Sequence, residues 1–478
     1  MKHIFSIICV LILGANLSAQ EKEWSLQECI ARALEKNISI RQSQLDVELA
    51  KTEKSDAIGN FIPSVNASAT NTWNTGLTQN ITTGILQTQT TRNFSAGITA
   101  GLTLFDGLRN FKQLQRAKLS ILGNKYALEE MKDNIALAVA NFYLQVLFNK
   151  ENLKVIQAQH QITLEQLERS QELVNAGVLP SGDLLEIKAT SANEVQRIIE
   201  AKNTITISLI ALAQTLLIED YENFDVEERD YAIFGSDILD IPVSEIIARA
   251  KEERYEIKVA KVNKKIAEKD VELAKGAYWP TLGAFFNYNT RSSGAGRFIS
   301  GGLDPNEPYR EIGFVESTME PVVAPNVMSR IGSPLPFFEQ RQLNDGITYG
   351  VQLSIPILNG FATRNAVKRN EINVKRAEYQ LTQAELDLEA DVHQAFVDAQ
   401  GAYKSYEAAL VALRAQELAF EYATERYDVG LINAFDYSQA KLRLDNAHSE
   451  VVQTKFDYIF KLKVLELYFG VPIADLKF

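Results

Sequence analysis

Two stretches of the chain alternate between apolar and polar positions, the pattern that indicates half-buried β-strands. In residues 94–104 every second side chain is apolar, and small or hydroxyl residues stand between them. Residues 347–357 repeat this alternation, and two further stretches show it less regularly. About ten residues is the length of a tilted strand that crosses a bilayer, but a soluble half-buried sheet gives the same pattern. We predict four strands in two hairpins, near 64–73, 93–104, 281–290 and 347–357.

Most of the remaining chain has the pattern of long helices. From Leu108 to Asn175 there is no proline and a single glycine, Gly123. At 1.5 Å per residue a helix of that span would reach roughly 100 Å. Apolar residues recur within it at alternating spacings of four and three, and a similar stretch runs from Phe361 to Val429. Heptad spacing of this kind predicts coiled-coil packing of long helices.

The chain also repeats itself. Residues 26–70 align without a gap with 243–287, and residues 97–217 align without a gap with 350–470. The second copy carries a long insertion between 288 and 349. Solenoid repeats have periods of only about 20–50 residues, so this pattern indicates one large unit used twice. We predict an internal twofold repeat, with residues 20–242 as the first copy and its linker and 243–478 as the second.

Each copy has a short break between its long helices. Gly177 marks the first break and Gly430 the second, as expected where a helix ends in the left-handed conformation. Asp183 and Asp436 follow each glycine at the same spacing, near the positive end of the next helix. A helix N-cap is the plain structural alternative for both aspartates. Each break is predicted to be the tip of a tight helical hairpin.

The N-terminal residues 1–19 resemble a secretory signal, with a basic start, an apolar core and small residues at its end. After it no run of 18 apolar residues occurs, so no membrane-spanning helix is expected. Cys29 is the only cysteine beyond this segment, and we expect it to be a small buried apolar residue on a helix.

Composition and motif content exclude several classes of function. The formal net charge is −12, and without a basic cluster the chain is not expected to bind nucleic acid. The four histidines are scattered, so no metal site is expected. No nucleophile elbow, paired catalytic carboxylates or phosphate-binding loop is found, so neither enzymatic activity nor a cofactor is expected.

The signal segment, the duplicated order of helix, two strands and two long helices, and the paired glycine–aspartate tips together resemble the TolC family of outer-membrane efflux proteins. The resemblance covers essentially the whole chain after the signal. It implies a mainly α-helical homotrimer. Each protomer would give four strands to one transmembrane β-barrel of twelve, and the regions 107–218 and 361–470 would build a coiled-coil helical tunnel through the periplasm. An incomplete sheet agrees with this assembly, because open strand edges are not tolerated in lipid.

The resemblance further implies a function and partners. The chain would be a passive export duct in the bacterial outer membrane, part of a tripartite efflux pump or a type I secretion system. Its partners would be outer-membrane lipid, a periplasmic adaptor protein, and an inner-membrane pump or ABC exporter. A soluble periplasmic coiled-coil adaptor or scaffold is the alternative, and a periplasmic hydrolase on a helical frame is a weaker one.

Site residues also follow from the resemblance. The family's pore-lining aspartate falls on Asp436, its tip tyrosine on Tyr427, and its other hairpin aspartate on Asp183. Two positions depart from the family, because a second ring aspartate is replaced by Gln439 and a latch arginine by Ile432. The expected ring therefore holds three carboxylates in a trimer rather than six. The residues expected to contact the adaptor are those of the tips: Gly177, Val178, Leu179, Gly430 and Leu431.

Overall fold

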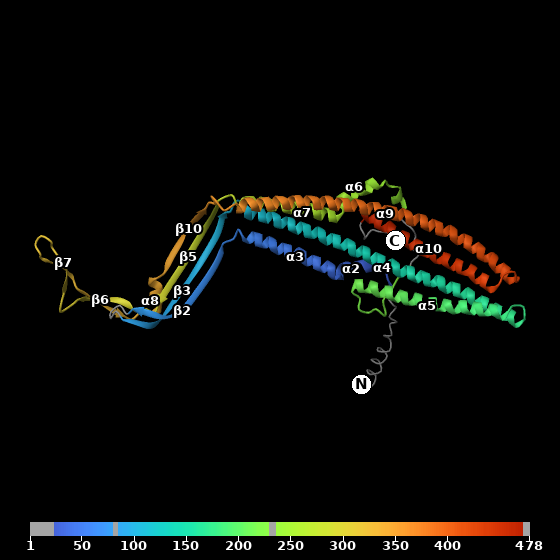
Figure 1. Cartoon of the computed structure of the whole chain (residues 1–478), viewed down its shortest axis with the longest axis horizontal. Coiled ribbons are helices and arrows are strands. Elements are labelled where there is room, and N and C mark those ends of the chain that lie inside the picture. The colour runs from blue at the N-terminus through green and yellow to red at the C-terminus, as the bar shows by residue number, and fades with distance from the viewer. Residues whose placement is uncertain (1–22, 80–84, 229–235, 472–478) are drawn as a thin grey trace, which may run out of the picture. The chain divides into compact units, whose positions relative to one another are not determined.

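The computed structural model describes residues 23–79, 85–228 and 236–471, and the predicted signal at 1–19 lies outside them (Figure 1). The α-helices are α2 (Leu26–Lys36), α3 (Ile38–Gly59), α4 (Arg109–Asn175), α5 (Ser181–Leu216), α6 (Val243–Glu253), α7 (Tyr255–Gly276), α8 (Phe337–Leu343), α9 (Ala362–Asp428) and α10 (Ala434–Tyr468). The strands are β1 (Glu23–Trp24), β2 (Ser64–Gln79), β3 (Leu86–Phe105), β4 (Asp225–Val226), β5 (Thr281–Ser293), β6 (Arg297–Leu303), β7 (Tyr309–Phe314), β8 (Pro321–Pro325), β9 (Val327–Gly332) and β10 (Gly346–Ser354). A 3₁₀-helix, η1, spans Ser236–Asp240.

The chain divides into two compact units. Of the described residues, a helical unit contains those within 1–52, 117–268 and 372–478, and a sheet unit contains those within 53–116 and 269–371. The prediction of a mainly helical chain with a smaller β part is confirmed. None of the described helices combines the length and apolar character that a membrane crossing requires.

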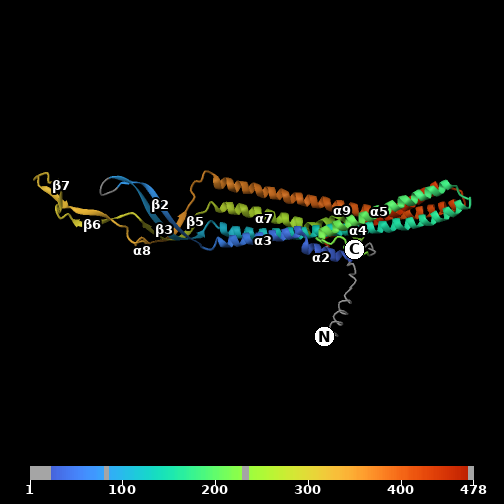
Figure 2. The ribbon, with the colours of Figure 1, turned by 90° about the horizontal axis from the view of Figure 1, so that it is seen from below.

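Helix lengths pair off between the two halves of the chain. Helices α4 and α9 each have 67 residues, and α5 and α10 have 36 and 35. The shorter helices α2 and α6 have 11 residues each, and α3 and α7 have 22 each. In the helical unit, α4 with α5 and α9 with α10 form two hairpins, whose turns lie at the same end in both views (Figures 1 and 2).

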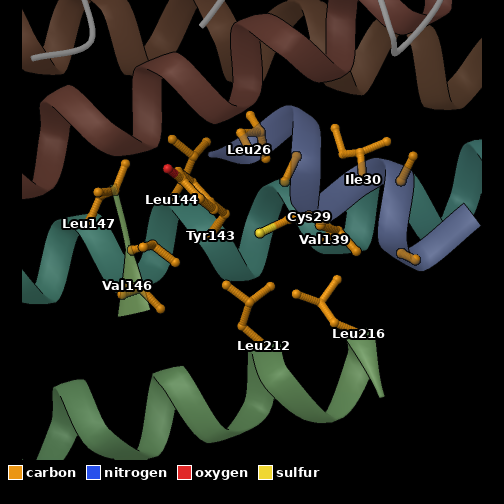
Figure 3. Packing of buried hydrophobic residues seen from close by; sticks show 14 of the residues in the cluster. Leu26, Cys29, Ile30, Val139, Tyr143, Leu144, Val146, Leu147, Leu212 and Leu216 are labelled. Carbon is orange, nitrogen blue, oxygen red and sulfur yellow. The ribbon is translucent and has the colours of Figure 1, made fainter. Parts of the chain in front are cut away.

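One core of the helical unit forms where buried residues of α2, α4 and α5 pack together (Figure 3). Tyr143 of α4 is fully buried there, and its hydroxyl donates to the carbonyl oxygens of Trp24 at 3.3 Å and Glu227 at 3.0 Å. Cys29 is also fully buried, as predicted. The tyrosine hydroxyl thus reaches both the start of the described chain and the linker between the two halves, where β1 pairs with β4.

The sheet unit is built on a four-stranded antiparallel sheet in the order β10-β5-β3-β2. Its register places Val351 opposite Ala284, and Ala284 opposite Leu102, so these three side chains lie on the same face. The same register brings apolar positions from each of the four strands to that face, here called the apolar face: Val65, Ala67, Ala69, Ile98, Ala100, Leu102, Leu282, Ala284, Phe286, Tyr288, Ile347, Tyr349, Val351 and Leu353. The opposite, polar face carries Asn66, Ser68, Thr70, Thr99, Thr103, Asn287, Thr348 and Gln352.

One aromatic side chain, Phe285, belongs to the polar face. Its cross-strand partners are Gly101 on β3 and Gly350 on β10. A Cβ atom at Gly350 would lie 3.2 Å from the phenyl ring. The two glycines therefore leave room for the ring to lie over the backbone of the neighbouring strands.

The strands β2 and β3 are longer than predicted. The strands were predicted near 64–73 and 93–104, but β2 continues to Gln79 and β3 starts at Leu86. Threonine has a high strand propensity, and the Thr75 and Thr90 hydroxyls lie 2.8 Å apart across the strands. The polar residues at 74–79 and 87–92 therefore belong to strands that carry polar side chains on both faces, and not to a loop.

The long insertion before β10, for which no helix or strand was predicted, also contains regular secondary structure. It forms two short antiparallel ladders, β6 with β9 and β7 with β8, and the helix α8. Helix α8 packs against β5, because the Thr290 hydroxyl donates to the Arg341 carbonyl oxygen at 2.7 Å. Thr290 is only 2% exposed and has the strand parity of the apolar face.

Candidate functional site at the helical hairpin tips

The two hairpin tips have the same backbone geometry. Gly177 and Gly430 both have φ of +74°, the left-handed conformation that was predicted for them. The Val178 N–H donates to the Leu173 carbonyl oxygen at 2.9 Å, and the Leu431 N–H donates to the carbonyl oxygen five residues before it at 2.8 Å. These bonds close each helix with a Schellman motif. They leave Val178 and Leu431 each 68% exposed at the tips.

The aspartates after each tip lie in the first turn of the next helix, and neither is the N-cap. Asn433 caps α10, with its side-chain oxygen accepting from the Asp436 N–H at 2.8 Å. Pro180 occupies the cap position of α5 without a side-chain bond. The N-cap alternative is therefore wrong for both Asp183 and Asp436. Asp436 is exposed, whereas Asp183 is half-buried. The positive end of the helix still favours a carboxylate at both positions.

A small aromatic core, here called the tip core, joins the two hairpins. Tyr427 of α9 and Tyr437 of α10 are 3% and 4% exposed, and their ring centroids lie 4.9 Å apart. Ile187 of α5 is buried in the same cluster, and the phenyl ring of Phe420 lies 5.4 Å from the Tyr437 ring. Burial raises the pKa of Tyr437 to about 12. In this conformation Tyr427 is a core residue and does not line an open surface.

The remaining predicted residues lie around this core. Leu179 and Ile432, one in each tip, are partly buried against it. Gln439 is half-buried on α10, less than one turn after Asp436. Ile432 thus packs against the tip core and forms no ionic contact, as expected of an apolar side chain.

An ion pair that sequence reasoning missed connects the hairpins. The Arg169 guanidinium of α4 lies 3.0 Å from the Asp428 carboxylate at the end of α9. Both side chains are partly exposed, so the pair contributes only about 0–1 kcal/mol. No sequence signal could have found it, because the two residues lie on different hairpins.

A buried polar cluster, here called the buried ion cluster, joins α4, α5 and α10 farther from the tips. The Lys441 ammonium lies 2.6 Å from the Glu194 carboxylate and 3.2 Å from the Asp445 carboxylate. Glu194 also accepts from the Thr163 hydroxyl at 2.8 Å and lies 3.1 Å from Nδ1 of His160. The three charged side chains are 3%, 5% and 6% exposed. Burial raises the pKa of Asp445, and the ammonium of Lys441 opposes this shift.

Sequence reasoning also missed this cluster. Lys441 aligns with Lys188 in the first copy, but Lys188 is exposed. The spacing of Lys441 and Asp445 is typical of the exposed faces of helices, so it does not by itself predict burial. Among the residues that the structure describes, no three His, Cys, Asp or Glu side chains gather as a metal site would require.

An antiparallel sheet with one apolar face, whose strands are followed along the chain by long paired helices, is typical of one class of protein. That class is the outer-membrane channel with a helical tunnel. Solved structures of that class share the fold. The outer membrane protein VceC of Vibrio cholerae matches with a TM-score of 0.70 and 14% identity, covering 94% of this chain and 96% of that one. The outer membrane channel CmeC of Campylobacter jejuni matches with a TM-score of 0.68 and 16% identity, covering 93% and 85%.

The amino-acid sequence of the chain also matches a family of outer-membrane proteins. The model of the outer membrane efflux protein family matches residues 29–216 and 246–470. The outer membrane protein TolC of Vibrio cholerae is 23% identical over 345 residues, which cover 70% of this chain and 67% of that relative. The outer membrane protein TolC of Escherichia coli K12 is 20% identical over 467 residues, covering 96% and 84%. The chain belongs to the outer membrane efflux protein family.

Family membership decides between the functions that the sequence left open. The chain is an efflux channel of the bacterial outer membrane, as predicted, and not a soluble periplasmic adaptor or scaffold. The family is one of channels.

Proposed function

We propose that this channel works as a homotrimer whose protomers share one β-barrel of twelve strands. The observation that carries the proposal is a sheet with one apolar face and two edge strands, β2 and β10, that each have a single neighbour among the described strands. An unpaired edge is not tolerated in lipid, so each edge needs a strand from another chain. All neighbours in the sheet are antiparallel. Pairing β10 of one protomer with β2 of the next therefore keeps the alternation and closes the sheet.

We expect the detergent-solubilised protein to have three times the mass of one chain, which is 53.5 kDa before the predicted signal is removed. Light scattering combined with refractive index would measure this mass free of the detergent contribution. A stable monomer would contradict the shared barrel, because four strands cannot close alone.

We further propose that the hairpin tips form the gate of the channel at its periplasmic end. Asp436 is exposed on the first turn of α10, and its neighbour Phe435 is 55% exposed. Three symmetry-related carboxylates around a narrow axis would attract cations and repel one another. Gln439, three residues after Asp436 on α10, adds no charge to this ring. The tip core and the Arg169–Asp428 ion pair would hold the two hairpins of each protomer together in the closed state.

We expect Asp436→Asn to lower the cation preference of the channel and to weaken its block by divalent cations. Conductance and reversal potential in planar bilayers would measure both. Asp183→Asn is the matched control, because Asp183 occupies the equivalent position of the other hairpin and is half-buried, and its effect is expected to be smaller. Unchanged selectivity and block in Asp436→Asn would rule out the carboxylate ring and leave apolar contacts as the gate.

The exposed apolar residues of the hairpin tips suggest where partner proteins bind. Val178, Val429 and Leu431 are 68–69% exposed apolar side chains at the ends of the hairpins. Exposed apolar side chains that gather at one end favour contact with another protein. We propose that a periplasmic adaptor binds these tips and couples the channel to an inner-membrane pump or exporter, in a tripartite efflux pump or a type I secretion system.

A further inference from the structure

Helix α8 lies on the apolar face of the sheet, at the point where that face becomes polar. The last fully apolar row joins Ala67, Ile98 and Tyr288, and two residues further along the strands stands Thr290, buried under α8. The side chain of Gln340 fixes the helix, accepting from the Ser293 N–H at 2.8 Å and donating to the Ser293 carbonyl oxygen at 2.9 Å. If the apolar face meets lipid, as expected of an outer-membrane channel, this position of α8 corresponds to the level of the lipid headgroups.

Aromatic side chains gather around α8. Phe337 of the helix packs edge-to-face on Phe94 of β3, with ring centroids 5.0 Å apart. Phe338 lies next to it and is 73% exposed, and Leu343 at the other end of the helix is 65% exposed. Aromatic residues concentrate at both interfaces of membrane barrels, where one side of the ring meets acyl chains and the other meets headgroups. Two of the side chains of α8 thus project outward, toward the lipid.

Two arginines belong to the same cluster. The Arg341 guanidinium lies 5.7 Å from the ring centroid of Phe337 and 5.9 Å from that of Phe94. The Arg92 guanidinium lies 5.9 Å from the rings of both Phe337 and Trp73. Both guanidiniums therefore contact the same aromatic ring, Phe337.

These guanidiniums have unused hydrogen-bonding capacity. Within the described part of the chain neither arginine forms an ion pair, and Nε of Arg341 is buried without a hydrogen-bond partner. The Nε of Arg92 donates to the side-chain oxygen of Asn71 at 2.9 Å, so its two terminal guanidinium nitrogens can still donate to a ligand. Helix α8 itself carries one acidic residue, Glu339, which is exposed. Guanidiniums that stack on aromatic rings present their donors to planar or tetrahedral anions such as carboxylate and phosphate.

We propose that Arg92, Arg341 and the aromatic side chains of α8 form a binding site for the phosphate-bearing headgroup of an outer-membrane lipid. Acyl chains would lie along the apolar face and against Phe338 and Leu343, while the headgroup phosphate accepts from the two guanidiniums. The proposal rests on the family assignment and on the apolar face meeting lipid. It does not depend on the gate or on the adaptor.

The test uses the purified full-length channel in neutral detergent, titrated with diphosphorylated lipid A and followed by native mass spectrometry. The Arg92→Gln/Arg341→Gln variant is expected to retain the lipid at least tenfold more weakly than the unmodified channel. Arg310→Gln is the matched control, because Arg310 is an exposed arginine of the same insertion without an ion pair among the described residues, and it is expected to bind as the unmodified channel does. Equal binding by the double variant would overturn the proposal.

Two further arms separate the sources of phosphate. Dephosphorylated lipid A is expected to bind the unmodified channel as weakly as lipid A binds the double variant. Millimolar inorganic phosphate is expected to leave lipid A bound, because the acyl contacts are absent for the free anion. Complete displacement by inorganic phosphate would overturn the lipid assignment in favour of a free-anion site. If the double variant does not assemble, Arg341→Gln alone carries the same test, since Arg341 donates no side-chain hydrogen bond within the described residues.

Discussion

Replacement of Lys441 by methionine is expected to destabilise the helical unit by about 3–5 kcal/mol, the cost of breaking a buried ion pair by removing one partner. The ammonium of Lys441 is the only positive charge in direct contact with the carboxylates of Glu194 and Asp445 among the described residues. Without it two carboxylates would stay buried side by side, apart from the His160 contact of Glu194. A methionine fills the volume of the aliphatic stem but supplies no donor.

The midpoint of thermal unfolding, followed by circular dichroism at 222 nm in detergent, would measure this effect. A loss of this size corresponds to a decrease of roughly 5–10 °C for a unit of several hundred residues. Lys188→Met is the matched control, because Lys188 is the aligned residue of the first copy and is exposed. Lys188→Met should change the free energy of unfolding by no more than the roughly 0.5 kcal/mol typical of surface substitutions, so its midpoint should hardly move. Equal midpoints for the two variants would show that the buried ion cluster does not stabilise the fold.

Asp445→Asn separates the ion pair from simple burial. The pKa of Asp445 is raised by burial, so the folded protein holds this proton to a higher pH than the unfolded chain does. Its contribution to stability is then fully present below the ordinary value of 3.8 and is lost as pH rises through the folded pKa. Asparagine removes the charge and keeps the Lys441–Glu194 pair. This variant should therefore cost much less at neutral pH than Lys441→Met.

The second large effect is expected in the sheet. Val351→Arg should prevent assembly in the outer membrane, because an arginine at a mid-barrel lipid position costs about 2–4 kcal/mol in each protomer. In a trimer the three copies together would cost roughly 6–12 kcal/mol. Val351 is 68% exposed on the apolar face, where it stands opposite Ala284.

Gln352→Arg is the control for this substitution, since Gln352 is the next residue of β10 and belongs to the polar face. Heat-modifiable trimers recovered from the outer-membrane fraction would measure assembly. We expect Gln352→Arg to yield trimers and Val351→Arg to yield few or none. If both variants assembled equally well, the apolar face would not meet lipid, and the headgroup site at α8 would lose its basis as well.

Much of the fold follows from local pattern. The alternation in β3 and β10 set the face of Ile98 and Val351, because side chains of a strand point to opposite sides in turn. Heptad spacing and the absence of proline predicted the long helices, and the two tip glycines adopt the left-handed conformation expected of them. These features depend on residues that are close together in the sequence, so they can be predicted from it directly.

Cap positions and loop contents were harder to predict. Asn433 rather than Asp436 caps α10, because the cap is decided by where the backbone leaves the helical conformation. The predicted strands stopped near 73 and began near 93, because the polar residues beyond these bounds carry no alternation. Only the pairing of residues 74–79 with 86–91 extends β2 and β3.

The sequence by itself determined the alternation, the helix lengths, the glycine turns and the resemblance to a family of efflux channels. Only the tertiary structure decided which long-range partners meet. It placed Lys441 against Glu194 and left the aligned Lys188 exposed, paired Arg169 with Asp428, and buried Tyr427 and Tyr437 together. It also laid α8 on the apolar face, with Arg341 near Arg92 of β3. Local pattern reports which face of a helix or strand is apolar, whereas the partner of a buried charge depends on elements hundreds of residues away.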